Sequence, residues 1–141
     1  MRWLFIISGL IGIISISLTE RQYNFKIIGG NERFDVIAVG GKLDISEFEI
    51  KNISDKSLQL NWRTVDNSLP SSWDYSMCAY GECQIGIPKG AKLKVIEPNK
   101  KGFIALHVFP KNNKGFGVVT FEISDPITGQ KELVKFSVQV K

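Results

Sequence analysis

Histidine and cysteine are scarce in this chain of 141 residues, which contains one histidine, His107, and two cysteines, Cys78 and Cys83. A structural zinc site needs four ligands, and a blue-copper site needs two histidines together with a cysteine. The chain cannot supply either set if its cysteines bond to each other, so we predict no metal site. It also lacks the Cys-x-x-Cys pair that is typical of thiol redox enzymes.

Catalytic signatures are missing as well. No serine or acidic residue can be matched to His107 by a recognisable triad motif, and the chain has no glycine-rich phosphate loop. The carboxylates Asp35, Asp44, Glu47 and Glu49 fall on strand positions that face solvent, and nothing forces two of them into a cleft. His107 sits in an apolar strand, where a single histidine is usually structural. We therefore predict a protein that is not an enzyme and binds no cofactor.

The N-terminus is strongly apolar. One basic residue, Arg2, precedes an uncharged run over residues 3–18, which is typical of a secretory signal peptide. The run of about 16 residues is close to the lower limit of roughly 17–25 for a membrane-spanning helix, so an uncleaved anchor and a buried helix remain alternatives. Ser15 and Ser17 provide a small-x-small cleavage site. We predict an exported protein that is periplasmic or associated with the cell envelope, with an extracellular location as the alternative, and in which residues 1–17 are a signal peptide or anchor.

The rest of the chain alternates in the way that β-strands do. Leu58, Leu60 and Trp62 share one parity, which places Trp62 in the core. Residues 103–109 are almost continuously apolar, as expected of a central strand. The apolar residues of segment 43–50 change parity part-way, which predicts a β-bulge near Ser46 and Glu47.

Turn residues separate these apolar runs at short, regular intervals, and no helical periodicity follows the leader. This spacing predicts an all-β fold, an immunoglobulin-like antiparallel β-sandwich of seven to nine strands. About 120 residues remain after the leader, which is enough for one domain with its own core. We assign residues 18–42 to N-terminal strands or a linker and residues 43–141 to the sandwich.

The two cysteines lie five positions apart with Gly81 between them. A loop of this size can bring its ends within bridging distance, and an even pair in a small exported domain usually forms a disulfide. Metal binding and redox activity are the competing interpretations. The scarcity of other ligands disfavours metal binding, and the absence of Cys-x-x-Cys near a helix start disfavours redox activity. We predict a structural disulfide between Cys78 and Cys83 that stabilises the domain by roughly 2 kcal/mol.

Several short motifs occur in a fixed order along the chain: Asn52 in a turn, Trp62, Pro70-x-x-Trp73, Cys78-x4-Cys83 and Gly115-x-Gly117. Over about residues 43–140 this order resembles an Ig-like domain common in secreted Bacteroidota proteins. The resemblance implies a β-sandwich with paired cysteines, often upstream of a sorting domain for type IX secretion. No sorting domain follows here, because the chain ends at Lys141 after the last predicted strand. That difference favours a small periplasmic or envelope-associated protein.

Two features could bind a partner. Trp73, Tyr75 and Tyr80 flank the cysteines, and exposed aromatic side chains on a rigid loop can anchor a protein or a sugar. The alternative is that these rings hold the loop against the sandwich. Seven lysines in a stretch whose only acid is Glu97 form a basic strip that suits an anionic lipid or glycan, or simply a solvated face. They are Lys89, Lys92, Lys94, Lys100, Lys101, Lys111 and Lys114.

These observations lead to one main hypothesis and one alternative. The main hypothesis is a non-catalytic exported Ig-like module that serves as a structural or protein-interaction component of the bacterial envelope. The alternative is a glycan- or lipid-binding module that uses either the aromatic loop or the basic strip. Nucleic acid is not an expected partner, because the chain has no basic-aromatic binding motif and exported proteins seldom meet nucleic acids.

Overall fold

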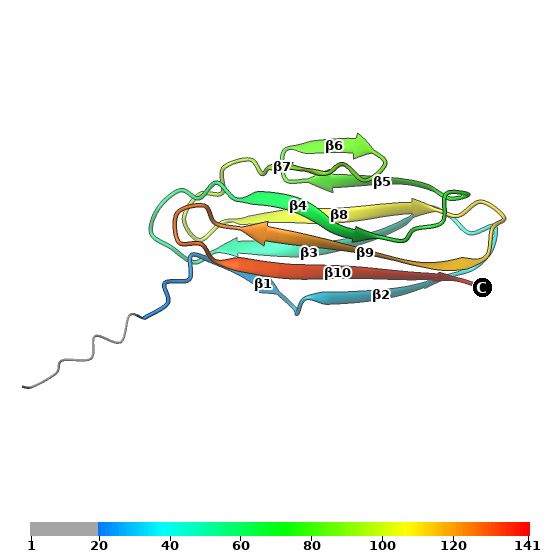
Figure 1. Ribbon diagram of the computed structural model, residues 1–141, viewed down its shortest axis with the longest axis horizontal. Helices are drawn as coiled ribbons and strands as arrows, with labels where there is room; N and C mark the ends of the chain where they lie inside the picture. Colours follow the sequence, from blue (N-terminus) through cyan, green and yellow to red (C-terminus); the bar gives the residue numbers. More distant parts are fainter. Residues whose placement is uncertain (1–19) are drawn as a thin grey trace, which may run out of the picture.

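The computed structural model describes residues 20–141, so the predicted signal peptide or anchor lies outside the described residues. These residues form ten strands in two layers (Figure 1). The strands are β1 (Phe25–Ile28), β2 (Glu32–Ile37), β3 (Asp44–Asn52), β4 (Asn61–Asn67), β5 (Asp74–Ala79), β6 (Glu82–Ile85), β7 (Gly90–Lys92), β8 (Lys101–Phe109), β9 (Gly115–Ser124) and β10 (Lys131–Val140). Within residues 20–141, no helix is long and apolar enough to cross a membrane.

Each layer is a five-stranded sheet. Sheet A has the order β1-β3-β8-β5-β6, and sheet B has the order β2-β10-β9-β4-β7. Every strand pairing is antiparallel except that of β2 with β10. The predicted all-β, Ig-like sandwich is confirmed, and β8 is the central strand of sheet A, as predicted for residues 103–109. Ten strands are more than the seven to nine that were expected. The ten include two very short strands, β6 with 4 residues and β7 with 3.

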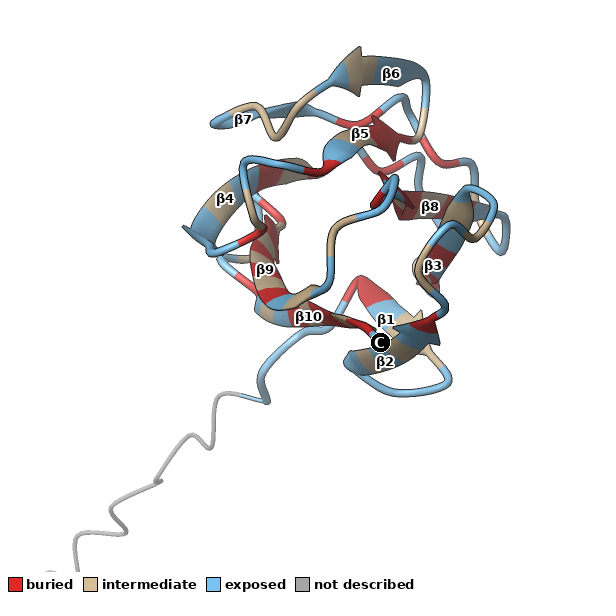
Figure 2. Cartoon of the chain, turned by 90° about the vertical axis from the view of Figure 1, so that its right-hand side faces the viewer, coloured by how far each residue is buried: buried red, intermediate tan, exposed pale blue. Residues whose placement is uncertain are grey.

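The core lies between the two sheets, and the buried residues of both layers lie around it (Figure 2). Four aromatic rings form its centre. Phe48 of sheet A contacts Phe136 of sheet B with ring centroids 4.6 Å apart, Phe136 contacts Phe121 at 6.1 Å, and Phe121 contacts Trp62 at 5.7 Å. All three contacts are edge-to-face, which is a favoured arrangement of aromatic rings. The prediction that Trp62 fills the core is confirmed.

The predicted bulge in β3 is wrong. Residues 44–51 pair with β8 in an unbroken register, so parity does not change along the strand. Ser46, Phe48 and Ile50 face the core, whereas Ile45 lies on the opposite face and is 59% exposed. The apolar residues of the segment thus belong to both faces of one regular strand. The sheet irregularity is found in β4 instead, between Thr64 and Asp66.

The chain crosses from sheet A to sheet B near its N-terminal end. Gly29 and Gly30, between β1 and β2, have φ values of 74° and 88°, a region that side-chain-bearing residues rarely adopt. This turn allows β1 to pair with β3 while β2 pairs with β10. Residues 25–37, within the segment assigned to N-terminal strands or a linker, therefore contribute one edge strand to each sheet.

Asp125, in the turn between β9 and β10, is almost completely buried and is surrounded by hydrogen-bond donors. Its carboxylate accepts hydrogen bonds from the Ile127 N–H at 2.9 Å, the Thr128 hydroxyl at 2.8 Å and Asn24 Nδ2 at 2.8 Å. Burial alone would raise the pKa of Asp125, but these bonds outweigh it and hold the pKa below 3.8, the ordinary value. The carboxylate thus ties the segment before β1 to the β9–β10 turn.

The Pro-x-x-Trp and Gly-x-Gly motifs of the sequence pack against each other. A methyl group on Gly117 would lie 2.8 Å from Leu69 Cα and 2.9 Å from Pro70 Cδ, and one on Gly115 would lie 3.2 Å from the Trp73 ring. Trp73 Nε1 also donates a hydrogen bond to the carbonyl of Asn113 at 3.0 Å. The two glycines therefore leave the space on β9 that the loop over residues 69–73 occupies.

We expect Gly117→Ala to lower the free energy of unfolding by about 1–3 kcal/mol, the usual range for overpacking. The added methyl group would displace the backbone of Leu69 and the ring of Pro70, because both contacts are shorter than van der Waals distance. Urea denaturation of the two proteins measures the difference. A Gly117→Ala variant as stable as the parent would show that the loop contributes nothing to the packing of β9.

Candidate functional site

The predicted disulfide is present and joins β5 to β6. Cys78 and Cys83 are directly opposite each other, with Cα atoms 4.0 Å apart. In an antiparallel ladder, residue pairs that exchange backbone hydrogen bonds alternate with pairs that exchange none. The Gly86 N–H donates to the Tyr75 carbonyl, which makes Tyr75 and Gly86 a bonded pair. Cys78 and Cys83 are three positions further along and therefore form a pair without backbone hydrogen bonds. Side chains approach most closely at such pairs. The bond closes a short hairpin at the edge of sheet A.

Removing the disulfide by the double substitution Cys78→Ala, Cys83→Ala is expected to lower the free energy of unfolding by about 2 kcal/mol, because the loop it closes is short. Only the β5–β6 hairpin depends on it, so the rest of the sandwich should persist. Chemical denaturation gives the free energy, and hydrogen exchange of β6 against β8 locates the loss. Equal loss of protection in both strands would contradict a local role.

The outer face of sheet A carries a group of exposed apolar residues beside this disulfide. The strand register places Ile85 of β6, Ser76 of β5, His107 of β8 and Ile45 of β3 in one row across four strands. Phe109 lies two residues further along β8. The exposed fractions are 96% for Ile85, 59% for Ile45, 52% for Leu43 and 40% for Phe109. We call Leu43, Ile45, Ser76, Ile85, His107 and Phe109 the sheet A face.

The sheet A face is hollowed at its centre. Ser76 is small, whereas Leu43, Ile85 and Phe109 around it are large, and together with Asp74, Tyr75 and His107 they line a shallow depression of ≈ 300 Å³. His107 projects its imidazole among these apolar groups and is half-buried. The hollow therefore offers mainly apolar contact, with a hydroxyl and an imidazole available for hydrogen bonds. These are features of a binding surface.

The three aromatic residues singled out in the sequence do not form one surface. Trp73 is 3% exposed because it packs on Gly115. Tyr75 and Tyr80 are partly buried against the core, and Tyr80 contacts Phe103 edge-to-face with centroids 5.8 Å apart. Trp73 and Tyr80 flank opposite ends of β5, roughly 20 Å apart at the usual rise of a strand. Trp73 offers no surface to a partner, and the two tyrosines offer only parts of their rings.

The lysines of the predicted basic strip are also dispersed. Lys101 begins β8, whereas Lys111 follows its end, which separates them by roughly 30 Å. Each has an acidic partner: Lys101 Nζ lies 2.7 Å from a Glu49 oxygen and Lys111 Nζ lies 3.0 Å from an Asp74 oxygen. The seven residues therefore do not make a continuous strip.

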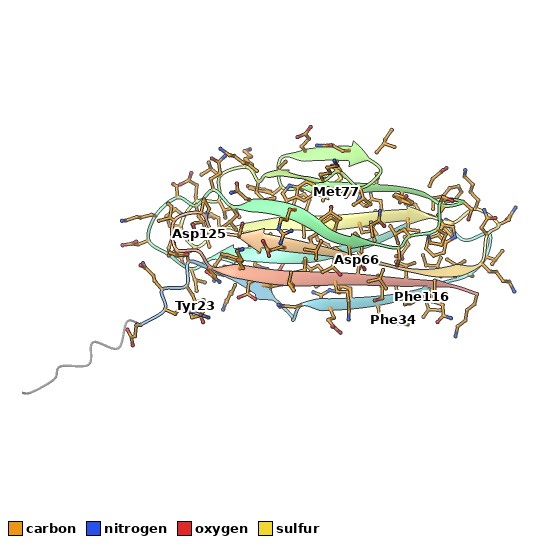
Figure 3. The ribbon with its side chains drawn as sticks, viewed as in Figure 1. Tyr23, Phe34, Asp66, Met77, Phe116 and Asp125 are labelled. Carbon is orange, nitrogen blue, oxygen red and sulfur yellow. A yellow bond between two sulfur atoms is a disulfide. The ribbon has the colours of Figure 1, made fainter. Side chains whose placement is uncertain are left out.

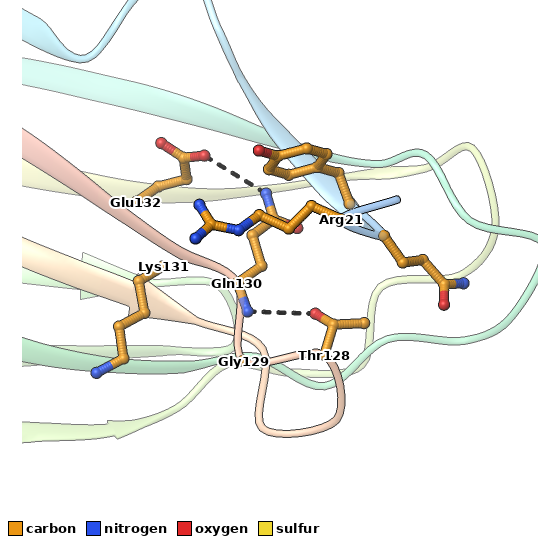
Figure 4. A pocket seen from close by; sticks show the side chains of 8 residues that line it. Arg21, Thr128, Gly129, Gln130, Lys131 and Glu132 are labelled. Carbon is orange, nitrogen blue, oxygen red and sulfur yellow. Dashed lines mark hydrogen bonds between the residues drawn. The ribbon is translucent and has the colours of Figure 1, made fainter. Parts of the chain in front are cut away.

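A second hollow lies at the end of the sandwich where the chain enters β1 (Figure 4). Its volume is ≈ 560 Å³, and its lining combines the cations Arg21 and Lys131 with Glu132 and the amide of Gln130. The side chain of Gln130 is already engaged, since its Nε2 donates to the carbonyl of Phe25 at 2.8 Å. Charges of both signs line the hollow, and they do not converge on one point.

The ionisable groups of residues 20–141 include no cluster of three or more His, Cys, Asp or Glu side chains that could hold a metal ion. The carboxylates Asp35 and Asp44 do approach each other, at the seam between β2 and β3. Burial raises the pKa of Asp44, and the neighbouring charge of Asp35 raises it further. Neither residue belongs to the sheet A face.

Comparison with family models finds no match for this chain, and comparison with curated proteins finds none either. Solved structures do match. The N-terminal domain of PorA superposes with a TM-score of 0.58 and 16% identity over 83% of this chain and 97% of that domain. PapD-like domain 7 of human CEP192 gives a TM-score of 0.53 and 11% identity over 98% of this chain and 97% of that domain. With identities this low, the two superpositions show only that this chain shares the β-sandwich fold of these domains.

Sequence reasoning missed the sheet A face because its members are far apart in the chain. Ile45 and Ile85 are 40 positions apart, and only the strand register brings them into one row. Two signals were available in the sequence: Leu43 and Ile45 have the parity opposite to Phe48, and Ile85 follows the polar Gln84. The first signal predicts a bulge if the strand has one apolar face, but in the structure it marks an apolar outer face.

Proposed function

We propose that this protein is a non-catalytic, exported Ig-like module that binds a protein partner in the bacterial cell envelope through the sheet A face. The observation that carries the proposal is the row of exposed apolar side chains around Ser76 and His107. The solvent side of a β-sheet is normally polar, and apolar groups gathered there mark an interaction surface. The adjacent disulfide holds the edge of this surface in one conformation, which lowers the entropic cost of binding.

Export is supported by two independent features. The apolar leader of residues 3–18 has the composition of a signal peptide or anchor, and structural disulfides such as Cys78–Cys83 form and persist mainly in oxidising compartments. Membership of the Ig-like domains of secreted Bacteroidota proteins is supported by the motif order. In the structure, the Pro-x-x-Trp and Gly-x-Gly motifs are in contact, so their joint occurrence has a packing reason.

The proposal is tested by capturing partners from native envelopes with the parent protein and with Ile45→Glu, Ile85→Glu. The face variant should lose the partner, because two carboxylates would have to be buried in an apolar interface. The matched control is Ile127→Glu, at an 83% exposed position in the β9–β10 turn. It should retain the partner.

Recovery of the same partner by the face variant and by the control would overturn the assignment of the sheet A face. Binding of all three proteins to a glycan array or to anionic vesicles, without a protein partner, would favour the alternative of a glycan- or lipid-binding module. Circular dichroism before capture confirms that each variant retains the fold.

A further inference from the structure

Strand β2 is an edge of sheet B with no strand on its outer side, and it belongs to the opposite layer from the sheet A face. The carbonyls of Asn31 and Ile37 accept hydrogen bonds from the N–H groups of Lys135 and Lys141, and the Val39 N–H donates to the Lys141 carbonyl. Odd-numbered residues therefore direct their backbone groups toward β10. The N–H and C=O groups of Phe34 and Val36 consequently point away from the sheet, where it has no further strand.

Two of the three outward side chains of this edge are apolar, and the third, Glu32, pairs with Lys135 of β10 at 2.7 Å. Phe34 is 61% exposed and Val36 is 56% exposed, and Phe34 lies beside Phe116 of β9 with ring centroids 6.5 Å apart (Figure 3). With 6 residues, β2 is longer than the other edge strands, which have 4, 4 and 3. It contains no proline, and its register with β10 contains no bulge. An edge of this length without proline or bulge can pair with another strand if the partner matches its charges, since inward-pointing charges oppose other pairings.

Two opposite charges lie on the inner side of β2. Arg33 donates to the carbonyls of Glu47, Gly29, Glu32 and Ile28, and its guanidinium carbon is 4.5 Å from the centroid of the Phe48 ring. Among residues 20–141, no carboxylate lies within ion-pair distance of Arg33. Asp35 Oδ2 is buried without any hydrogen-bond partner. A cation and an anion, both without an ionic partner, are thus two positions apart on one face.

We propose that two copies of this chain pair through β2, antiparallel, about a two-fold axis at Phe34. In this register Phe34 lies opposite Phe34 of the second copy, and Arg33 of each copy lies opposite Asp35 of the other. Phe34 forms a pair that exchanges two backbone hydrogen bonds, because its N–H and C=O groups face outward. The two sheets B then join into one continuous sheet, and each Asp35 is brought close to a positive charge.

The charges select this register among the alternatives. Only the even-numbered residues of β2 direct their backbone groups outward. The other possible registers of two antiparallel β2 strands therefore differ from the proposed one by steps of two residues. A shift in one direction places Arg33 opposite Arg33, and a shift in the other places Asp35 opposite Asp35. Like charges directly opposite each other are unfavourable in a sheet. A strand that is self-complementary in only one register fits a second copy of itself, since a symmetric dimer uses the same surface twice.

Engineered cysteines test the register. Phe34→Cys should form a disulfide between two copies on mild oxidation, because Cα atoms of such a pair are about 5.5 Å apart, within disulfide range. Val36→Cys is the matched control: it lies opposite Glu32 of the second copy and should form no cross-link above the collisional level. The native cysteines are paired and do not compete. Equal cross-linking by both variants would overturn the proposed register.

Light scattering coupled to size-exclusion chromatography tests the pairing itself. The exported protein should elute with the mass of a dimer, and Val36→Pro should elute as a monomer. Proline removes the outward N–H of residue 36 and leaves the bonds between β2 and β10 in place. Circular dichroism checks the fold of this variant. A parent protein that remains monomeric at every concentration would refute the proposal, even if the proline variant fails to fold.

Discussion

Replacing Phe136 by alanine is expected to lower the free energy of unfolding by about 3–5 kcal/mol, the range for large aromatic residues deleted from a core. Phe136 is fully buried and contacts Phe48 of the opposite sheet and Phe121 of its own sheet. Its removal would leave a cavity between the layers and would break both edge-to-face contacts. Urea denaturation monitored by circular dichroism measures the effect.

Phe116→Ala is the matched control for this experiment. Phe116 belongs to the neighbouring strand β9 but is 53% exposed on the outer face of sheet B. Its truncation should cost less than about 1 kcal/mol, because little buried area is lost. Similar losses for the two variants would mean that the aromatic centre does not hold the sheets together.

Replacing Asp125 by alanine is expected to cost about 2–4 kcal/mol at neutral pH. The substitution leaves the buried amide of Asn24, the Ile127 N–H and the Thr128 hydroxyl without their acceptor. Asp125→Asn should cost less, since its carbonyl oxygen can still accept from Ile127. Asp55→Ala, at an exposed position in another turn, should leave stability unchanged.

The stabilisation by Asp125 should depend on pH. Its pKa is lower in the folded protein than in the unfolded chain, so the unfolded state takes up the proton first as the solution is acidified. The contribution is therefore complete above the ordinary pKa of 3.8 and is lost as pH falls through the lower, folded value. The difference in free energy of unfolding between the parent and Asp125→Ala should therefore shrink in acid, since the protonated carboxyl keeps one accepting oxygen but loses its charge. A difference that stays constant down to about pH 2, below the ordinary carboxyl range, would contradict this.

The sequence predicted what depends on local alternation. Leu58, Leu60 and Trp62 are buried as their parity indicates, and the apolar run of residues 103–109 lies in a central strand. The disulfide followed from the short spacing of the only two cysteines. Alternation alone does not show which of two apolar sets in a strand faces the core. In β3, Ile45 belongs to one set and Phe48 and Ile50 to the other, and the sequence therefore predicted a bulge that the structure does not have. Ile45 is exposed because β3 keeps a regular register with β8.

The surfaces could not be predicted because they depend on strand order. The row from Ile45 to Ile85 exists only because β3, β8, β5 and β6 are neighbours in that order. The pairing of β2 with β10 joins residues about 100 positions apart, and nothing in either strand specifies a parallel partner. The aromatic loop illustrates the same limit: Trp73 packs on Gly115, which is more than 40 positions away in the sequence.

The parallel pairing of β2 with β10 also determines how the domain responds to tension along the chain. The chain enters β2 at Glu32 and leaves β10 at Val140, and the two strands run in the same direction (Figure 1). A force applied directly at Glu32 and Val140 therefore slides one strand past the other and loads all the hydrogen bonds between them at once. Such shear resists rupture better than peeling, which breaks one bond after another. Between these two points, the parallel pair gives sheet B its greatest resistance to a force along its strands.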